Sequence, residues 1–224
     1  MSLLKGKKAL IIGLANERSI AWGIAKSLKE HRAKLAFSYM NDSLKKRVVP
    51  LAEEIGADFT FELDVTNEEH ILRMKKIIQE KWGEFDILIH SLAFADRKDL
   101  SQKFQHTSRS GFSVALDVSA YSLVAVVDAV SELIKNEGSV ISMSYYGSQK
   151  VVSNYNVMGV AKAALESATR YLAADLGDRG IKVNFVNYSC LYGKFFIKFF
   201  RYNDGYIRYS CYYFYLSWFI YVLY

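Results

Sequence analysis

The stretch that decides the fold is KALIIGLANERSIAWG, residues 8–23. Its first five residues form a short apolar run that predicts a buried strand, and an amphipathic pattern typical of a helix begins at residue 20. Gly13 permits a tight turn between the two elements, and Ser19 can cap the helix, whose N-terminus offers free N–H groups to an anion. Because the turn is not G-x-G-x-x-G, it fits either a dinucleotide pyrophosphate or an ordinary strand–helix connection.

The same alternation continues outward along the chain. Further apolar runs occupy residues 34–39, 58–63, 86–90, 139–143 and 181–186. Amphipathic stretches separate them at residues 20–29, 42–55, 67–82, 111–135 and 155–176. This βα repeat predicts a parallel sheet covered on both faces, and therefore a Rossmann-like, doubly wound α/β fold in three layers.

Two local signals refine the helices. Thr66 and Glu69 have the spacing of a capping box at the start of the third helix, where they would satisfy free N–H groups. Pro50 lies inside the second helical pattern, and its ring and missing N–H are expected to kink or shorten that helix.

Composition bounds the class of protein. The chain has 224 residues, of which 51% are hydrophobic and 23% charged, as expected of one globular domain. Residues 1–184 contain no cysteine, and the N-terminus lacks the apolar core of a signal peptide, so we expect a cytoplasmic protein. The net charge is +6, but the cations do not cluster with aromatics, so no nucleic-acid partner is expected. The four histidines lack metal-ligand spacing, so no metal is expected.

Residues 185–224 have a different composition from the rest. They hold 18 of the 33 aromatic residues and both cysteines, but no Ala, Glu, Gln, Thr, His, Met or Pro. Their apolar end, residues 209–224, is 16 residues long and falls short of the roughly 20 that span a bilayer, so no membrane partner is expected. We therefore divide the chain into a catalytic domain, residues 1–184, and an anomalous tail, residues 185–224.

Polar residues follow the strand ends, where ligands of parallel sheets bind. Asp64 and Val65 follow the third strand, and Ser91 and Leu92 follow the fourth. The Asp64 carboxylate can accept from an adenine amino group, or it can simply stabilise the next helix through the helix dipole. The residues around Met40, after the second strand, lack the cation that a 2′-phosphate requires, which favours NADH over NADPH.

Tyr155 and Lys162 form the candidate catalytic pair. Their spacing of seven residues is nearly two helical turns, about 10.5 Å of rise, so both side chains lie on one helix face. A nearby cation favours a tyrosine that donates to a developing oxyanion, although packing or helix capping is the alternative role for Tyr155. Tyr146 and Lys150 have the Tyr-x3-Lys spacing of short-chain dehydrogenases, but Gly147 and its neighbours place this pair in a loop, so we reject it.

Four segments carry a resemblance to a known family: residues 13–23, 38–42, 90–95 and 154–159. With the long first turn and the Tyr-x6-Lys spacing, they strongly resemble the NADH-dependent bacterial enoyl-acyl-carrier-protein reductases, a divergent branch of the short-chain dehydrogenases. The resemblance covers about residue 3 to residue 184. It implies type II fatty-acid synthesis, in which a nicotinamide hydride goes to the β-carbon of a trans-2-enoyl thioester and the α-carbon is protonated through water.

The resemblance also implies roles for individual residues. Tyr155 would hydrogen-bond the enolate oxygen, Lys162 would hold the nicotinamide ribose, and Tyr145 would be the second active-site tyrosine, lining the acyl pocket. Ala95 would contact the substrate. The expected cofactor-binding residues are Gly13, Ser19, Ile20, Met40, Asp64, Val65, Ser91, Leu92 and Lys162. Expected partners are the acyl carrier protein, its enoyl thioester, and further copies of this chain in a homotetramer.

The sequence departs from the family pattern at several positions. Met40 stands where Gln is common, Ser153 where Pro is common, and Ala93 where Gly is frequent. Arg32 replaces a turn glycine and would strain the backbone if its φ is positive.

The family's Gly-Pro-Ile turn, helical flap and last strand are not recognisable in residues 185–224. We interpret this tail as a frameshift in an AT-rich gene, with a genuine replacement segment as the alternative. Two other functions stay open at this stage: a carbonyl reductase that uses Tyr146 and Lys150, and an inactive remnant.

Overall fold

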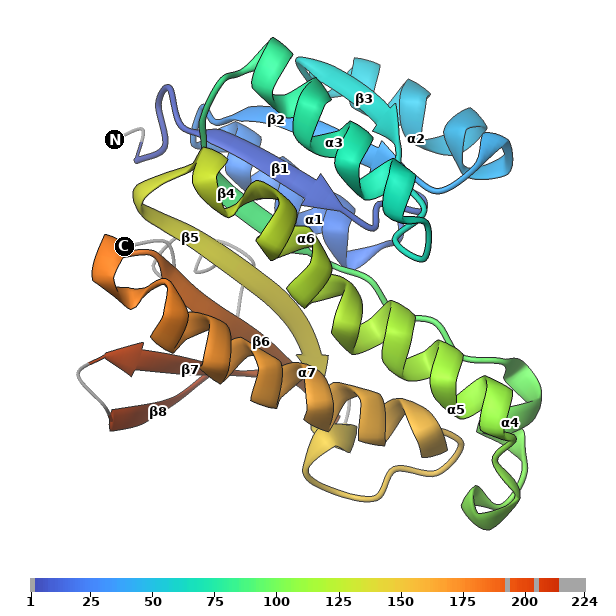
Figure 1. Cartoon of the computed structure of the whole chain (residues 1–224). Helices are drawn as coiled ribbons and strands as arrows, with labels where there is room; N and C mark the ends of the chain where they lie inside the picture. Colours follow the sequence, from blue (N-terminus) through green and yellow to red (C-terminus); the bar gives the residue numbers. More distant parts are fainter. Residues whose placement is uncertain (1–2, 192–193, 204–205, 214–224) are drawn as a thin grey trace.

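The computed structural model describes residues 3–191, 194–203 and 206–213, with side chains described for residues 3–187. Strands and helices alternate as predicted (Figure 1). In chain order the elements are β1 (Lys8–Ile12), α1 (Ile20–Glu30), β2 (Lys34–Tyr39), α2 (Asp42–Glu54), β3 (Phe59–Glu62), α3 (Glu68–Lys81), β4 (Phe85–His90), α4 (Arg97–Ser101), η1 (Phe104–His106), α5 (Arg109–Leu116), η2 (Asp117–Tyr121), α6 (Ser122–Val130), η3 (Ser131–Leu133), β5 (Ile134–Tyr145), η4 (Tyr146–Ser148), α7 (Asn156–Asp175), η5 (Gly177–Arg179), β6 (Lys182–Leu191), β7 (Lys194–Asn203) and β8 (Tyr206–Tyr213).

The strands form one sheet in the order β3-β2-β1-β4-β5-β6-β7-β8. Every pairing from β3 to β6 is parallel, which confirms the Rossmann-like fold. The strand order reverses between β1 and β4, the point where doubly wound sheets bind ligands. Beyond β6, where the sequence indicated no recognisable family element, β7 and β8 extend the sheet with antiparallel pairing.

Helices cover both faces of the sheet (Figure 1). The helices α1 and α2 lie on one face, where Trp22 and Val48 pack with the buried strand residues Ile11 and Phe37. The helices α3, α6 and α7 lie on the other face and enclose the larger apolar cluster. Within the described part of the chain, no third helix accompanies α1 and α2 over β5 and β6.

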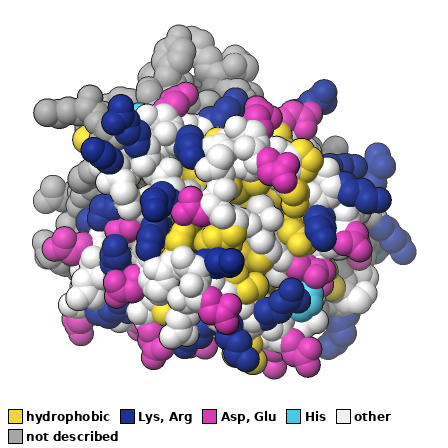
Figure 2. Space-filling view, turned by 90° about the horizontal axis from the view of Figure 1, so that it is seen from above, with side chains coloured by type: hydrophobic (Ala, Val, Ile, Leu, Met, Phe, Trp, Pro, Cys, Tyr) yellow, Lys and Arg dark blue, Asp and Glu magenta, His cyan; other side chains and the backbone are white. Residues whose placement is uncertain are grey.

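Figure 2 shows the molecule from above, turned by 90° about the horizontal axis from the orientation of Figure 1. Lys and Arg side chains alternate with Asp and Glu side chains over this face, around a central group of apolar side chains. The charges of this face are therefore mixed rather than segregated by sign, which limits long-range electrostatic attraction from this side.

The start of α3 differs from the prediction. The N-cap is Asn67, whose side chain accepts from the N–H groups of Glu69 and His70. Thr66 is not the cap, because its hydroxyl donates to Oδ1 of Asp64 at 2.8 Å. The predicted N-cap is therefore wrong by one residue, and the predicted capping box does not form, because the third residue after Asn67 is His70.

Pro50 and Arg32 are the two other residues expected to disturb the local backbone. The helix α2 runs from Asp42 to Glu54 through Pro50, so the predicted shortening is wrong. Pro50 lies on the exposed side, while Val48 and Ala52 anchor the helix to the sheet from the buried side. Arg32 has a φ of 66°, so the condition under which its backbone was expected to be strained is met.

The long helix predicted for residues 111–135 is interrupted. The helices α5 and α6 are joined by η2, a π-helical turn. The helical path ends with η3, and β5 begins at Ile134, earlier than the predicted strand. A π-helical turn adds a residue to the ordinary helical repeat and is often found at functional sites.

Candidate active site

The first turn packs directly against the end of β4. Gly13 has a φ of 98°, and a Cβ at this position would lie 2.2 Å from the carbonyl oxygen of Ser91. The Ser91 N–H donates to the carbonyl of Ile12 at 2.9 Å, which joins the two strand ends. Glycine is therefore required here both for its conformation and for the close backbone approach.

The N-terminus of α1 suits an anion. Ser19 is its N-cap, as predicted, and its side chain accepts from the N–H of Trp22 at 3.3 Å. The first turn of α1 contains no acidic side chain, and Ile20 is 43% exposed. The free N–H groups and the positive end of the helix dipole are thus available to a pyrophosphate.

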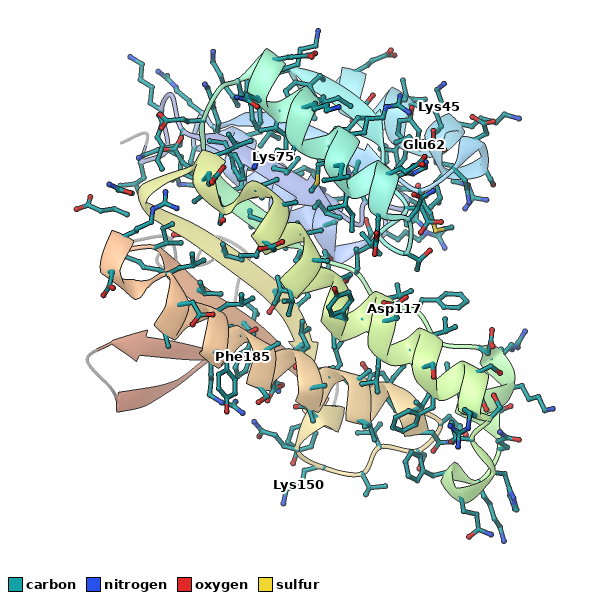
Figure 3. The ribbon with its side chains drawn as sticks, in the orientation of Figure 1. Lys45, Glu62, Lys75, Asp117, Lys150 and Phe185 are labelled. Carbon is teal, nitrogen blue, oxygen red and sulfur yellow. The ribbon has the colours of Figure 1, made fainter. Side chains whose placement is uncertain are left out.

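The ends of β2 and β3 lie beside this turn in the sheet. Met40 is 48% exposed, and Val65 is buried. The Oδ1 atom of Asp64 accepts from both the N–H and the hydroxyl of Thr66, and none of the described hydrogen bonds involves Oδ2, so the local structural role is compatible with an adenine contact. The Nζ atom of Lys45 lies 5.8 Å from the centroid of the Tyr39 ring. The end of β2 therefore has a cation nearby, although no Lys or Arg follows the strand directly in the sequence. Figure 3 labels Lys45 in α2.

Lys162 joins the ends of β4 and β5 from α7. Its side chain is buried, and Nζ donates to the carbonyl oxygens of Leu92 at 3.1 Å and Met143 at 2.7 Å. Burial lowers the pKa of Lys162 to about 8, and the opposite charge of Glu166 raises it in part. The residue is therefore a buried cation at the strand ends, where a ligand of this fold binds.

Glu166 lies one turn beyond Lys162 on α7 and is also buried. Its Oε1 atom accepts from the hydroxyls of Ser144 and Ser148 and from the amide of Asn187. These donors belong to β5, η4 and β6. The carboxylate thus ties three elements to α7, and sequence reasoning did not identify it, although its i+4 spacing from a lysine was a usable signal.

Tyr145 and Tyr155 lie together. Their ring centroids are 4.7 Å apart with an interplanar angle of 61°, an edge-to-face contact. A Cβ at Gly147 would lie 2.4 Å from the Tyr155 ring, and one at Gly159 would lie 2.6 Å from the Gly147 carbonyl. The two glycines let the turn after β5 close on Tyr155, which is the N-cap residue of α7 rather than its first helical residue.

The competing pair lies outside α7. Tyr146 begins the short turn η4, and Lys150 follows that turn, before the helix begins. Figure 3 shows Lys150 in the loop that precedes α7, with its side chain directed away from the helix. The i, i+4 spacing of this pair therefore does not place both side chains on one helix face.

The segment after β4 is held by the π-helical turn η2. The hydroxyl of Ser119 accepts from the N–H of Phe94 at 3.0 Å and lies 3.2 Å from the carbonyl of the same residue. Ala95 packs against a small apolar cluster that contains Val157 and Ala161 of α7. Ala95 therefore packs against the first turns of α7, which follow Tyr155 in the sequence.

Comparison with known proteins identifies this arrangement. The family model of enoyl-(acyl carrier protein) reductase matches residues 13–192. The chain belongs to this reductase family. The enoyl-[acyl-carrier-protein] reductase [NADH] FabI of Rickettsia bellii is 49% identical over 185 residues, which are 83% of this chain and 71% of the relative.

Solved reductase structures agree with the fold. The Anaplasma phagocytophilum enoyl-acyl-carrier-protein reductase in complex with NAD aligns with a TM-score of 0.81 and 42% identity, over 84% of this chain and 72% of that one. The Bacillus cereus reductase with NADP+ and indole naphthyridinone aligns with a TM-score of 0.80 and 43% identity, over 83% and 73%. The family and fold predicted from the sequence are confirmed.

One buried group of this reductase was assigned no role from the sequence. His90 is completely buried, and its Nε2 lies 2.8 Å from the hydroxyl of Ser122. Because that hydroxyl donates to the carbonyl of Val118, Nε2 must be the donor to Ser122, and Nδ1 has no partner. Burial, and then the charge of Lys162, lower the pKa of His90 to about 3, so the imidazole is neutral. Among the described residues, no group of three or more His, Cys, Asp or Glu side chains gathers as metal ligands.

Proposed function

We propose that this chain reduces trans-2-enoyl-acyl-carrier-protein thioesters to saturated acyl thioesters with NADH, as a step of type II fatty-acid synthesis. The observation that carries the proposal is the buried Lys162, held at the ends of β4 and β5 by two carbonyl oxygens. Membership of the reductase family and the paired rings of Tyr145 and Tyr155 support the same chemistry.

The residues at the sheet edge fit a dinucleotide. The turn at Gly13 and the N-terminus of α1 would hold the pyrophosphate, because that helix end is capped and carries no acidic side chain in its first turn. Met40, Asp64 and Val65 would lie toward the adenosine, and Ser91, Leu92 and Lys162 toward the nicotinamide ribose. When bound, NADH supplies the hydride that reduces the β-carbon.

The chain's own residues would stabilise the charge that develops on the thioester oxygen. Tyr155 donates a hydrogen bond to the enolate oxygen, and the Lys162 cation adds electrostatic stabilisation from a buried position. Tyr145 packs edge-on against Tyr155 and lines the acyl pocket. Ala95 leaves room for the acyl chain. A proton delivered through water to the α-carbon completes the reaction.

Oxidation of NADH by the purified full chain with a trans-2-enoyl thioester tests this proposal. We expect turnover that is reduced to a small residual rate in Tyr155→Phe and retained in Tyr146→Phe. The opposite pattern would support a carbonyl reductase that uses Tyr146 and Lys150, and no turnover from folded protein would support an inactive remnant. A parallel assay with NADPH tests cofactor choice directly, since Lys45 lies near the end of β2.

We further propose a cytoplasmic homotetramer that binds neither nucleic acid nor membrane. The helical stretch Arg109–Leu133 is long and apolar enough to cross a membrane. However, Leu123, Val126 and Val130 from this stretch belong to the core beneath the sheet, as expected for a core helix. Light scattering on the purified protein measures the assembly, and a mass of one or two chains would contradict the tetramer.

The tail requires a separate proposal. We propose that residues 1–184 form the catalytic domain and that residues 185–224 are read in a shifted frame. The concentration of 18 aromatic residues in this stretch supports the proposal, because out-of-frame reading of an AT-rich gene yields Tyr and Phe codons. Sequencing the gene decides the matter. A shifted frame after the Asn184 codon should encode a Gly-Pro-Ile turn, and a gene that encodes none in any frame would favour a genuine replacement segment.

A further inference from the structure

Tyr155 is flanked by two residues with unusual backbone conformations. Asn154 has a φ of 58° and Asn156 a φ of 34°, both on the left-handed side that most residues avoid. Asparagine tolerates this region better than most side chains. Strained backbone of this kind persists only where surrounding contacts hold it, so the contacts of these two residues are informative.

The two asparagines differ in their contacts. Asn154 is exposed, and none of the described hydrogen bonds involves its side chain. Asn156 is partly buried, and its Nδ2 atom lies 3.0 Å from the carbonyl oxygen of Leu100 and 2.6 Å from that of Gln102. The carbonyl of Asp99 lies at 3.4 Å from the same atom. One amide group therefore bridges to a backbone segment that is more than 50 residues earlier in the sequence.

These carbonyls belong to the end of α4. The last carbonyl groups of a helix have no partners within the helix, and they are usually satisfied by a turn that follows. Here the amide of Asn156 supplies the donor from the first residue of α7. The end of α4 and the start of α7 are thus locked to each other.

The α4 segment is itself held in place by hydrogen bonds of the Asp99 side chain. Asp99 is buried, and its carboxylate accepts from the Ser108 N–H at 2.8 Å, the Ser108 hydroxyl at 3.0 Å and the Gln102 amide at 2.8 Å. The backbone hydrogen bond from Ser108 is the main cause that lowers the pKa of Asp99, which keeps this side chain an acceptor. The same segment continues from Ala95, the proposed substrate contact.

We propose that Asn156 is a positioning residue, which fixes Tyr155 relative to the acyl-binding segment that runs from β4 into α4. The inference rests on the proposed function, in which Tyr155 donates to the thioester oxygen. Without the amide of Asn156, the start of α7 is free to relax toward ordinary helical dihedral angles. Tyr155 is the adjacent residue, so that relaxation moves its hydroxyl away from the substrate.

The matched pair Asn156→Gly and Asn154→Gly tests the proposal. Both substitutions tolerate the positive φ and remove a side chain next to Tyr155, but only the first removes the bridge to α4. We expect Asn156→Gly to lower kcat about tenfold or more, because misplacement by a fraction of an ångström to one ångström has effects of this order. The KM for NADH should change less than about twofold, and Asn154→Gly should stay within about twofold in both constants.

A double-mutant cycle separates positioning from general damage. In a Tyr155→Phe background, adding Asn156→Gly should change the residual rate by less than about twofold, since the hydroxyl it positions is already absent. A loss that persists in that background would overturn the proposal, as would equal effects of the two glycine variants. If Asn156→Gly does not fold, Asn156→Asp and Asn154→Asp replace the glycine pair, because aspartate tolerates a positive φ but has no N–H donor for the carbonyls of α4.

A readout without turnover distinguishes this inference from the proposed function. A single 3-fluorotyrosine at position 155 should show a shifted or broadened ¹⁹F resonance in Asn156→Gly and an unchanged one in Asn154→Gly. This result in a protein that reduces no enoyl thioester would refute the proposed function and leave the positioning role intact. An unchanged resonance in both variants of an active enzyme would overturn the positioning role alone.

Discussion

Glu166 controls the charge state of Lys162, so the substitution Glu166→Gln should move the alkaline limit of activity to lower pH. Burial lowers the pKa of Lys162 to about 8, and the Glu166 carboxylate is the charge that opposes this shift. Burial and the charge of Lys162 lower the pKa of His90 to about 3, so this imidazole is neutral and places no charge beside Lys162. Glutamine keeps the size and one acceptor oxygen of Glu166 but removes its charge. Only the effect of burial then remains.

The magnitude follows from the two states of Lys162. With a pKa of about 8, the side chain is roughly nine-tenths protonated at pH 7. A neighbouring opposite charge contributes about one to three pKa units, and a loss of about one unit leaves roughly half of the molecules protonated at pH 7. The rate at pH 7 should therefore fall by about half from this cause, and much more near pH 8.

The assay is kcat/KM for a trans-2-enoyl thioester measured from about pH 6 to about pH 10. The apparent pKa of the alkaline limb should fall from near 8 in the wild type to near 7 in Glu166→Gln. Ser148→Ala is the matched control, because it removes one hydrogen bond to Oε1 of Glu166 and leaves the charge in place. An alkaline limb that stays unchanged in Glu166→Gln, or that moves equally in Ser148→Ala, would refute the reasoning.

Two further predictions concern buried geometry. The pKa of His90 is lowered from 6.5 to about 3, so the unfolded chain binds a proton that the folded protein resists, and stability falls as the pH drops through this window. Between pH 7.5 and pH 4.5, His90 should lower the free energy of unfolding of the wild type by about 3 kcal/mol. In urea unfolding, the free energy of His90→Gln should therefore fall by about 3 kcal/mol less than that of the wild type over the same pH range. An identical fall in both proteins would contradict the assignment. Gly147→Ala should lower kcat/KM at least about tenfold, because a Cβ there would lie 2.4 Å from the Tyr155 ring. Gly177→Ala is its control, since a Cβ at Gly177 meets nothing within 4 Å, and equal effects of the two alanines would rule out the steric explanation.

The sequence carried enough information to predict the sheet and the family, while the roles of the site residues stay predictions. Hydrophobic runs and helical periodicity are local patterns, and they predicted every strand from β1 to β6 and the helices α1, α2, α3 and α7, but neither α4 nor the break between α5 and α6. The cap at Ser19 was predictable for the same reason, because it depends on neighbouring residues. The spacing of Tyr155 and Lys162 predicts a catalytic pair, and the structure shows that Lys162 is buried at the strand ends.

Other features depend on contacts between distant residues and could not be predicted. Thr66 and Asn67 are both good helix caps, and the choice between them is made by the Asp64 carboxylate, which engages the threonine hydroxyl. The π-helical turn η2 leaves no clear mark in the hydrophobic pattern, yet it brings Ser119 to the backbone after β4 and precedes the partner of His90. No pattern within the sequence connects a residue of α7 to the carbonyls of α4.

The structure also explains how α7 organises the electrostatic part of the site. Asn156, Lys162 and Glu166 project from this one helix and contact different neighbours: the end of α4, the ends of β4 and β5, and the donors of β5, η4 and β6. Each contact fixes the register of α7 against another element, so a shift that weakens one contact also disturbs the others. Among residues 3–187, whose side chains are described, Asn187 is the last in sequence that contributes, and the other described contacts of Lys162 and Glu166 come from earlier residues. The pH behaviour predicted for Glu166→Gln therefore tests the contacts that α7 makes with β4, β5 and β6.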